Sequence, residues 1–384
     1  MEFDPVVLTP QEEGLRAEVR AFLAEELRSG GYRPGRGMTG GFSPEFSRRV
    51  ASMGWVGMAI PARYGGHDRS AVERFIVIEE LLAAGAPIQA HWIADRQTAP
   101  MLLAFGTEEQ RNRFLPSIAR GECWFSIGMS EPDAGSDLAS VRTSATRTDA
   151  GWLVNGTKIW TSGADHNHYF VILCRTSPLG DDRHRGLSQL IVDLSSPGLT
   201  INPIALLTGS RGFNEVVMQD VYVPDEMVLG EVGMGWTQVT SELAYERSGP
   251  DRFLSSYQLL ELWLRERVSG SHDPAVAETV GRLVARLWTI RQMSLAVARA
   301  LDERRAPALE AAIVKDLGTT FEQFVVASIQ SLTEVDPDPG ATSAFENLLA
   351  ESVVMAPSYT IRGGTTEVLR SVVARSLVGA RKKP

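Results

Sequence analysis

Residues 129–137 read MSEPDAGSD, and they stand where the hydrophobic pattern of the chain changes from helical to strand-like. Before this stretch, from Pro10 to about Gly121, apolar residues recur with helical spacing. After it come short segments rich in valine, isoleucine, threonine and aromatic residues, as in strands. Its small residues let backbone N–H groups approach a ligand, and its serines add hydroxyls, which suits a flavin edge or a phosphate. A polar loop between a helix and a strand is the alternative interpretation.

The strand-like block extends to about Pro224, after which helical spacing returns. The expected strands are residues 140–148, 152–154, 158–161, 169–175, 188–193, 200–203 and 215–223. Asn155-Gly156 is predicted to form a hairpin turn, because both residue types tolerate positive φ. The expected later helices are residues 236–245, 253–268, 276–304, 308–332, 343–356 and 366–377.

The order of helices, then strands, then helices along the chain favours separate layers or domains over alternating β-α units. In the first block, Thr9 is the expected N-cap of one helix, and residues 71–84 form a second, more buried one. We expect three domains, which are helical over residues 1–122, β over 123–232 and helical over 233–384. A chain of 384 residues exceeds what one core comfortably supports, which agrees with this division.

Composition argues against several classes of protein. A net charge of -9 disfavours nucleic acid or an anionic membrane surface as the main partner. The two cysteines lie outside any C-x-x-C, which disfavours a disulfide framework and a structural zinc site, so no metal is expected. No signal peptide is visible at the start, and no window reaches the ~20 apolar residues of a membrane span. We therefore expect a cytoplasmic protein.

Three further motifs carry side chains suited to chemistry. Residues 158–164, KIWTSGA, place an aromatic ring before hydroxyls, which could stack on a flat ligand and bond its heteroatoms. Glu246, beside Arg247 at the end of an apolar helix, could act as a base if it faced an apolar cavity. Residues 361–367, IRGGTTE, give a tight turn and a capped helix start that suit an anionic or carbonyl ligand. The alternative interpretations of these three motifs are, in the same order, a core tryptophan, a surface charge pair and a capped helix without a ligand.

Together, in order and spacing, these motifs resemble the acyl-CoA dehydrogenase family over nearly the whole chain. The loop 130–137 and the segment 155–160, NGTKIW, resemble the family's two flavin-binding segments. The pattern is completed by residues 61–66, 106–110, 114–116, 221–224, 229–230, 233–235, 363–367 and 374–375. The resemblance implies an α+β multidomain fold with an N-terminal helical domain, a middle β-barrel and a C-terminal four-helix bundle. It also implies FAD between the last two domains.

The resemblance assigns roles residue by residue. Trp160 would pack on the flavin ring, Ser162 would stand near flavin N5, and Ser136 would face the CoA portion of the substrate. The implied cofactor-binding residues are Met129, Ser130, Trp160, Ser162, Thr365 and Glu367.

The implied reaction is α,β-dehydrogenation of an acyl-CoA thioester to the trans-2-enoyl thioester. A carboxylate takes the α-proton while the β-hydrogen leaves as hydride to the flavin. Many members carry this carboxylate just before the Gly-Thr of the C-terminal signature, where this chain has Gly363. A minority branch, which includes the isovaleryl and long-chain enzymes, places it before an arginine on an earlier helix. Glu246 before Arg247 matches that position, so we predict Glu246 as the base, oriented by Arg247, which alternatively orients the substrate, with Glu367 as the competing carboxylate.

Two segments depart from the family pattern. Residues 267–274, RVSGSHDP, lack the family's Arg-x-x-Phe-Gly motif, and residues 335–340 form an Asp-Pro loop instead of its glutamine and paired-glycine segment. In the family both segments touch FAD of the neighbouring subunit. The resemblance implies a homodimer or homotetramer served by an electron-transfer flavoprotein. The departures and Gly363 leave open a non-catalytic or half-site subunit of a heterotetramer, and a flavin oxidase or an enzyme for carrier-protein thioesters is a further alternative.

Overall fold

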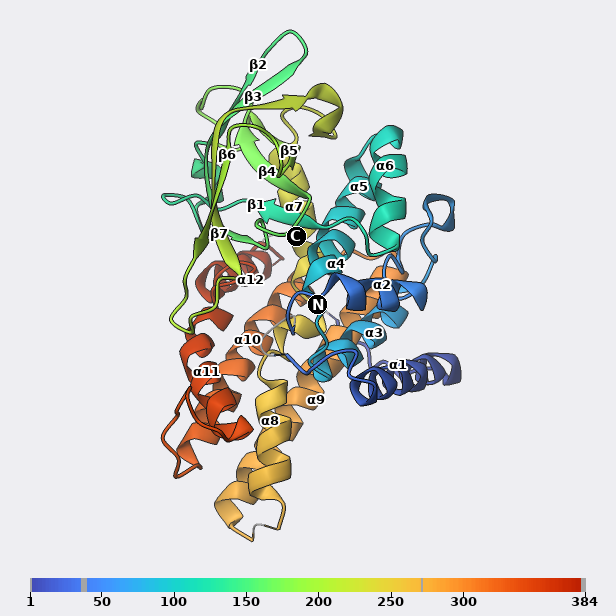
Figure 1. Cartoon of the computed structure of the whole chain (residues 1–384), viewed down its shortest axis with the longest axis vertical. Helices are drawn as coiled ribbons and strands as arrows, with labels where there is room; N and C mark the ends of the chain where they lie inside the picture. Colours follow the sequence, from blue (N-terminus) through green and yellow to red (C-terminus); the bar gives the residue numbers. More distant parts are fainter. Residues whose placement is uncertain (1, 36–39, 271, 381–384) are drawn as a thin grey trace. The chain divides into compact units, whose positions relative to one another are not determined.

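The chain forms two compact units in a computed structural model that describes residues 2–35, 40–270 and 272–380 (Figure 1). The side chains of residues 242–246 and 379–380 lie outside this description. The sheet unit comprises Ser43–Arg69 and Gln89–Leu243. The helical unit comprises Met1–Phe42, Ser70–Ile88 and Ala244–Pro384.

The sheet unit is built on one mixed sheet of eight strands. They are β1 (Phe125–Gly128), β2 (Ser144–Arg147), β3 (Gly151–Ser162), β4 (Tyr169–Arg175), β5 (Leu187–Asp193), β6 (Leu199–Ile204), β7 (Phe213–Pro224) and β8 (Val228–Leu229). Their order is β6-β7-β3-β2-β4-β5-β8, and β1 pairs with β4 in parallel. The long β3 and β7 pair antiparallel over most of their length, and this ladder supports the candidate site.

The predicted hairpin turn at Asn155-Gly156 is wrong, because β3 runs through both residues without a break. The ladder to β7 absorbs them as a register shift between Val154 and Gly156. Glycine is required there for another reason, since a Cβ on Gly156 would lie 2.4 Å from Oγ1 of Thr143. The missing side chain of this glycine therefore allows a close approach of Thr143 at a bulge and does not mark a chain reversal.

Five helices accompany the sheet in the same unit. They are α2 (Pro44–Ser52), α4 (Gln89–Ile93), α5 (Ala99–Phe105), α6 (Glu108–Ala119) and the first part of α7 (Gly235–Glu246). α6 begins at a capping box of Thr107 and Gln110, and it buries Phe114 against Phe125 of β1, with ring centroids 5.5 Å apart. The Gln110 side chain also donates to the carbonyls of Glu226 and Val228, both at 2.7 Å, which joins α6 to β8.

The helical unit contains the remaining long helices. They are α1 (Pro10–Arg28), α3 (Ala71–Ala83), α8 (Tyr257–Trp263), α9 (Pro274–Asp302), α10 (Ala308–Ser331), α11 (Ala344–Tyr359) and α12 (Thr366–Ala380). α10 packs against α9, α11 and α12 (Figure 1). The predicted cap at Thr9 is confirmed, because its side chain and that of Glu12 bond each other's backbone N–H reciprocally.

Ion pairs to two glutamates of α3 join three helices of this unit. Arg291 of α9 donates to both carboxylate oxygens of Glu79 in α3, at 2.6 and 2.8 Å. Arg20 of α1 holds the neighbouring Glu80 in the same two-pronged way, at 2.7 and 2.9 Å. Burial raises the pKa of Glu79, so its charge depends on Arg291. α1 and α3 are thereby attached to the C-terminal helices.

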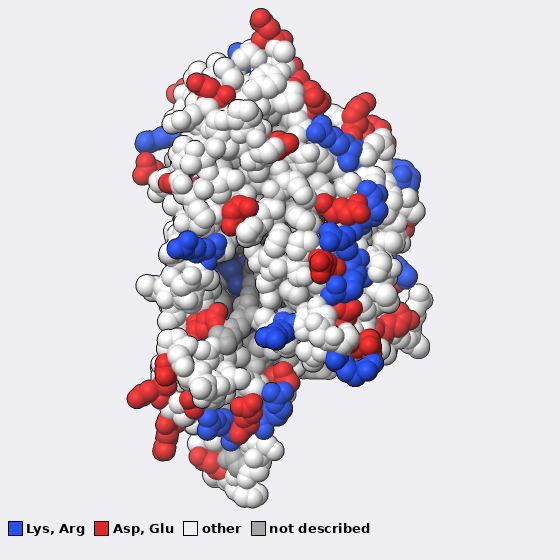
Figure 2. All heavy atoms as spheres, viewed as in Figure 1, with Lys and Arg blue, Asp and Glu red and all other residues white. Residues whose placement is uncertain are grey.

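The predicted order of helical, β-sheet and helical regions is confirmed, whereas the boundaries at residues 122 and 232 stay a prediction. One helix starts later than expected: Pro250–Arg252 form a 3-10 turn, α8 begins at Tyr257, and Leu264–Val268 form a π-helical turn. On the face in Figure 2, acidic and basic side chains are interspersed. Within the described ranges, every helix is too short or too polar to cross a membrane.

Candidate functional site

The sheet unit brings two of the predicted cofactor segments together. β1 leads directly into Met129 and Ser130, and the backbone N–H of Ile159 in β3 donates to the carbonyl of Ser130 at 2.9 Å. Met129, Ser130 and the end of β3, with Trp160, therefore lie on adjoining backbone. The two motifs are about thirty residues apart in the sequence, and the backbone bond from Ile159 joins them directly.

A buried ion pair fixes this junction from inside. The Lys158 ammonium donates to Oε1 of Glu131 at 2.8 Å and to the carbonyl of Met129 at 3.1 Å, and the Lys158 side chain is 0% exposed. Glu131 also accepts from the backbone N–H groups of Arg142 and Thr143, at 2.6 and 2.9 Å. Burial opposes the charge on Glu131, but these partners outweigh it and hold its pKa below the ordinary value.

Glu131 and Lys158 belong to the two predicted flavin-binding segments, but the sequence indicates no role for either residue. Because a charged residue in a loop or a strand is usually solvated, the sequence alone does not predict that Glu131 and Lys158 form a buried ion pair. The available signal was the lysine at an inward-facing position, since Trp152, Val154 and Lys158 are all buried on β3. We interpret the pair as the support that holds residues 129–131 against β3.

Trp160 adopts a conformation that is uncommon for a bulky residue. Its φ is 61°, and it lies in a register shift between Lys158 and Thr161, where β3 has an extra residue opposite β7. Left-handed backbone of this kind costs of order 1–3 kcal/mol and persists only where the surroundings hold it. Its ring is 52% exposed and meets the ring of Phe213 edge-on, with centroids 6.1 Å apart. The strand therefore presents a half-exposed indole beside the partly exposed Ser162.

Ser136, predicted to face the substrate, lies on the exposed arm of the same loop. Its neighbour Asp137 accepts from Arg183 at 2.6 Å through both carboxylate oxygens and from the hydroxyl of Ser140 at 2.6 Å. The hydrogen bond from Arg183 is the main reason that the pKa of Asp137 is lowered. The arm is thus braced, and the Ser136 hydroxyl is left accessible.

The other predicted cofactor residues start α12 in the helical unit. Thr365 caps this helix by accepting from the backbone N–H of Val368 at 3.3 Å. Glu367 is exposed, and hydrogen bonds from its own backbone N–H and from Thr365 lower its pKa. An exposed carboxylate with a lowered pKa is a poorer proton acceptor than a buried one, which disfavours Glu367 as the competing base.

Buried cations surround the turn that precedes α12. Gly363 and Gly364 have φ of 66° and 90°, and a Cβ on Gly363 would lie 2.9 Å from a guanidinium nitrogen of Arg252. The Lys315 ammonium donates to the carbonyl of Gly364 at 2.6 Å and to that of Thr360 at 3.1 Å. Burial, and then the charges of nearby arginines, lower the pKa of Lys315 to about 8.

Two further arginines lie near the same turn. Arg362 donates to the buried carboxylate of Glu322 at 2.6 Å, and Arg247 lies 3.4 Å from where a Cβ on Gly364 would stand. Where many relatives are expected to carry a base, this chain therefore has glycine against a guanidinium. Glu246, the predicted base, is the last residue of α7, and its side chain lies outside the described residues.

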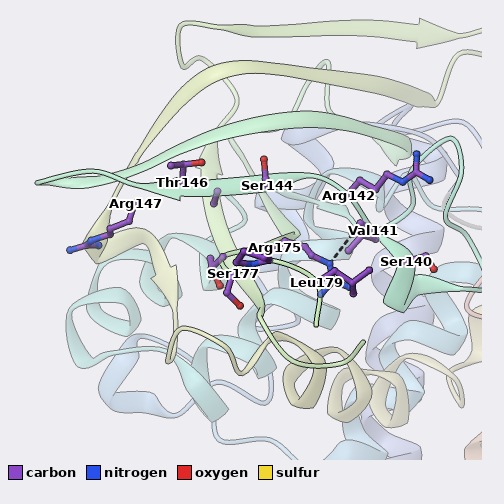
Figure 3. Close-up of a pocket in the computed structure, with 12 residues that line it drawn as sticks. Ser140, Val141, Arg142, Ser144, Thr146, Arg147, Arg175, Ser177 and Leu179 are labelled. Carbon is purple, nitrogen blue, oxygen red and sulfur yellow. Dashed lines mark hydrogen bonds between the residues drawn. The ribbon is translucent and has the colours of Figure 1, made fainter. Parts of the chain in front are cut away.

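A hollow of about 650 Å³ lies elsewhere in the sheet unit, between β2 and the segment that follows β4 (Figure 3). Its lining is residues 140–142, 144–147 and 175–179. Arg175 supports its wall by donating to the carbonyl of Val141 at 3.2 Å (Figure 3). It also donates to the carbonyl of Ala139 at 2.5 Å. The predicted site residues do not line this hollow.

The residues at the junction fit a flavin. Trp160 presents a half-exposed aromatic face, and the partly exposed Ser130 and Ser162 carry hydroxyls on either side of it in the sequence. A flat heteroaromatic ring needs these two elements, a surface for stacking and polar groups for its edge. Across the described ranges, histidine, cysteine and carboxylate side chains form no group of three that could hold a metal.

Comparisons with known proteins cover almost the whole chain. Residues 9–122 match the acyl-CoA dehydrogenase N-terminal domain, residues 126–221 the middle domain and residues 233–378 the C-terminal domain. Acyl-CoA dehydrogenase FadE34 of Mycobacterium tuberculosis is 33% identical over 95% of this chain, which spans only 48% of FadE34. Acyl-CoA dehydrogenase IpdE1 of the same organism is 31% identical, with 96% of this chain and 97% of IpdE1 covered.

Comparisons with solved structures agree with these sequence matches. The Tcur3481-Tcur3483 steroid ACAD is similar with a TM-score of 0.85 and 29% identity, over 99% of both chains. The ChsE4-ChsE5 complex from Mycobacterium tuberculosis has a TM-score of 0.81 and 28% identity, over 98% of this chain and 99% of that one. The three domain matches and these relatives show that the chain belongs to the acyl-CoA dehydrogenase family, a family of oxidoreductases.

Proposed function

We propose that this chain is an FAD-dependent dehydrogenase that converts an acyl-CoA thioester to its trans-2-enoyl thioester, with Glu246 as the base. Membership of the family implies flavin-dependent acyl-CoA dehydrogenation. The observation that supports the site is the bond from Ile159 to Ser130, which brings the loop of Met129 and Ser130 to the strand of Trp160. Without that junction the two motifs would be separate surface features.

The residues of this chain have distinct tasks in the proposed reaction. A bound flavin supplies the acceptor for the hydride that leaves the β-carbon. Met129 and Trp160 would pack on the ring, while Ser130 and Ser162 would bond its edge. Ser136, exposed on the braced arm, would meet the CoA portion of the substrate. Thr365 and Glu367 would lie along the rest of the cofactor.

Glu246 would take the α-proton of the thioester. Arg247, which is 9% exposed and lies beside Gly364, would orient the carboxylate or the substrate. Gly363 has no side chain to offer, and Glu367 is exposed with a lowered pKa. These two facts support the choice of Glu246 by disfavouring its competitors.

Glu246→Gln is the direct test, with Glu367→Gln as the matched control. Each purified protein is loaded with FAD and mixed anaerobically with a panel of acyl-CoA thioesters, and the loss of flavin absorbance is followed. We expect Glu246→Gln to slow this bleaching by about 10²–10⁴-fold, the usual contribution of a general base, and Glu367→Gln to slow it little. Bleaching at the unchanged rate in Glu246→Gln would overturn the assignment.

A second candidate is one subunit of a heteromeric acyl-CoA dehydrogenase. Two similar solved structures are two-component assemblies, Tcur3481-Tcur3483 and ChsE4-ChsE5, and this chain spans about half of FadE34. Gly363 and the altered segments at residues 267–274 and 335–340 favour the same arrangement. Because the Tcur3481-Tcur3483 protein is described as a steroid enzyme, the substrate panel should include a thioester with a steroid ring system.

Flavin content separates the two candidates. The chain purified alone should bind FAD and turn over with an electron-transfer flavoprotein as acceptor if it acts as a homo-oligomer. A protein that gains FAD only when a related chain is expressed with it would favour the heteromeric subunit. Turnover with oxygen and no other acceptor would instead favour a flavin oxidase. The cytoplasmic location stays a prediction.

A further inference from the structure

Trp160 needs support that its own strand does not supply. Its left-handed φ of 61° interrupts the ladder between β3 and β7, so the extra residue of the bulge lacks a place in the regular pairing. Unsupported, an aromatic residue would relax to the extended conformation that its neighbours adopt. Groups from outside β3 must therefore hold the backbone next to it.

Side chains from outside β3 hold the two carbonyls that follow Trp160. The Asn214 amide of β7 donates to the carbonyl of Thr161 at 3.2 Å and to the Asp165 carboxylate at 3.0 Å. The hydroxyl of Ser126 donates to the carbonyl of Ser162 at 2.8 Å. Asn167 in turn donates to that hydroxyl at 2.9 Å. Two successive peptide groups are thus each held by a side-chain donor from outside β3.

Asn214 and Thr161, whose carbonyl it holds, are buried, and this burial indicates the role of Asn214. Asn214, Thr161 and Ser126 are each 0% exposed. Within the described part of the chain, the amide oxygen of Asn214 has no hydrogen-bond partner, although its amide nitrogen has two. A buried acceptor without a partner is unfavourable, and an apolar residue would avoid that penalty. The residue therefore stabilises the strand through its two donated hydrogen bonds.

We propose that Asn214, assisted by Ser126 and Asn167 through the next carbonyl, that of Ser162, is a positioning residue that keeps Trp160 left-handed and so fixes its ring for the flavin. The second half of this statement rests on the proposed function, whereas the first half does not. Asn214 touches neither cofactor nor substrate in this proposal and acts only through the backbone of β3. Removal of the Asn214 side chain should leave the fold intact and should make the backbone of residues 159–163 more mobile.

Asn155 provides a matched control on the same pair of strands. Its amide donates to the Asp220 carboxylate at 2.8 Å, and its side-chain oxygen accepts from the backbone N–H of Asp220 at 2.9 Å. Asp220 is also left-handed, with a φ of 50°. Asn155→Ala therefore removes the same kind of support from the same ladder, at a position away from Trp160.

Hydrogen–deuterium exchange on the full chain without flavin tests the first half. Asn214→Ala should make amides of residues 159–163 exchange about tenfold faster than in wild type, while Asn155→Ala leaves them unchanged. Ser126→Ala removes one hydroxyl only, so it gives the same readout if Asn214→Ala fails to fold. Equal exchange in wild type, Asn214→Ala and Ser126→Ala would overturn the proposal.

Flavin fluorescence and midpoint potential test the second half on the FAD-loaded protein. Both should shift in Asn214→Ala and stay at the wild-type values in Asn155→Ala. Trp160→Ala identifies the source of any failure. If it alters neither quantity, the flavin does not pack on Trp160 and the proposed site is wrong, but the exchange result still decides the role of Asn214. If Trp160→Ala shifts both and Asn214→Ala shifts neither, the positioning role is wrong.

Discussion

At the scale of single residues, the Arg252 guanidinium occupies the space that a side chain at Gly363 would need. A Cβ there would lie 2.9–3.1 Å from three atoms of the Arg252 guanidinium, and the φ of 66° suits glycine. Arg252 is 2% exposed and lies 3.1 Å from the Asp251 carboxylate, so it has little freedom to move away. The common base position of the family is thus closed in this chain by sterics and by charge.

This leads to a prediction for Gly363→Glu in the Glu246→Gln background. The new carboxylate should pair with Arg252, which lowers its basicity and ties it to the guanidinium, so it should not restore the anaerobic bleaching that Glu246→Gln loses. The left-handed backbone should destabilise the protein by about 1–2 kcal/mol, and the contact of a Cβ with Arg252 should add to this loss; Gly363→Ala measures the two together by urea unfolding. Recovery of wild-type bleaching in the double variant would show that the position can still host a base.

A second prediction concerns Lys158 and Glu131. Lys158→Met leaves the Glu131 carboxylate buried without its cation, which should cost about 3–5 kcal/mol in the free energy of unfolding. Lys158→Met combined with Glu131→Gln should recover much of that loss, because no buried charge is left over. A double-mutant cycle in urea measures the coupling, and simple additivity of the two changes would contradict the interpretation.

At the scale of elements, the caps and helices were predictable, and two features were not. Thr9 is followed by Glu12 at the spacing of a capping box, a local signal that the fold leaves intact. Asn155-Gly156 carries an equally clear turn signal, yet the ladder between β3 and β7 overrides it. The junction of Ser130 with Ile159 was recognisable only through family resemblance, because its partners are far apart in the sequence.

The turn between α11 and α12 should respond to pH through Lys315. Its pKa of about 8 lies below the ordinary value of 10.5, so between those values the unfolded chain binds more protons than the folded one. Stability contributed by Lys315 should therefore increase as the pH rises through that window. Urea unfolding of wild type and Lys315→Met, from about pH 7.5 to about pH 9.5, should show a difference that shifts in favour of wild type. Parallel pH profiles of wild type and Lys315→Met would contradict the inference that the charge of Lys315 is buried and destabilised.

At the scale of the whole molecule, long-range ion pairs hold separate stretches of chain in one unit. Arg291 and Glu79 are 212 residues apart in the sequence, and Arg299 and Glu12 are 287 apart. Sequence periodicity reports on local elements and carries no signal for pairing at such distances. The N-terminal helices were therefore predictable as helices, whereas their division between two compact units was not.

Arg291→Ala tests the importance of this attachment. It removes two charged hydrogen bonds from the buried Glu79 carboxylate and, among the described residues, leaves only Arg16, 3.6 Å away, so we expect a loss of about 2–3 kcal/mol in urea unfolding. Arg120→Ala is the control, since its pair with Glu122 is exposed and should be worth about 0–1 kcal/mol. Similar losses in the two variants would mean that the pair with Glu79 is no more important than a surface contact.

The way the helical unit is assembled from three stretches of chain has a consequence for biosynthesis. The sheet unit is complete once Leu243 has left the ribosome, but α3 must wait for the partners of Glu79 on α9. At usual translation rates the 212 residues between Glu79 and Arg291 take about 10–40 s to make. During that interval the face of α3 that packs on α9 has no native partner, so we expect chaperones to bind the nascent chain before its C-terminal helices are made.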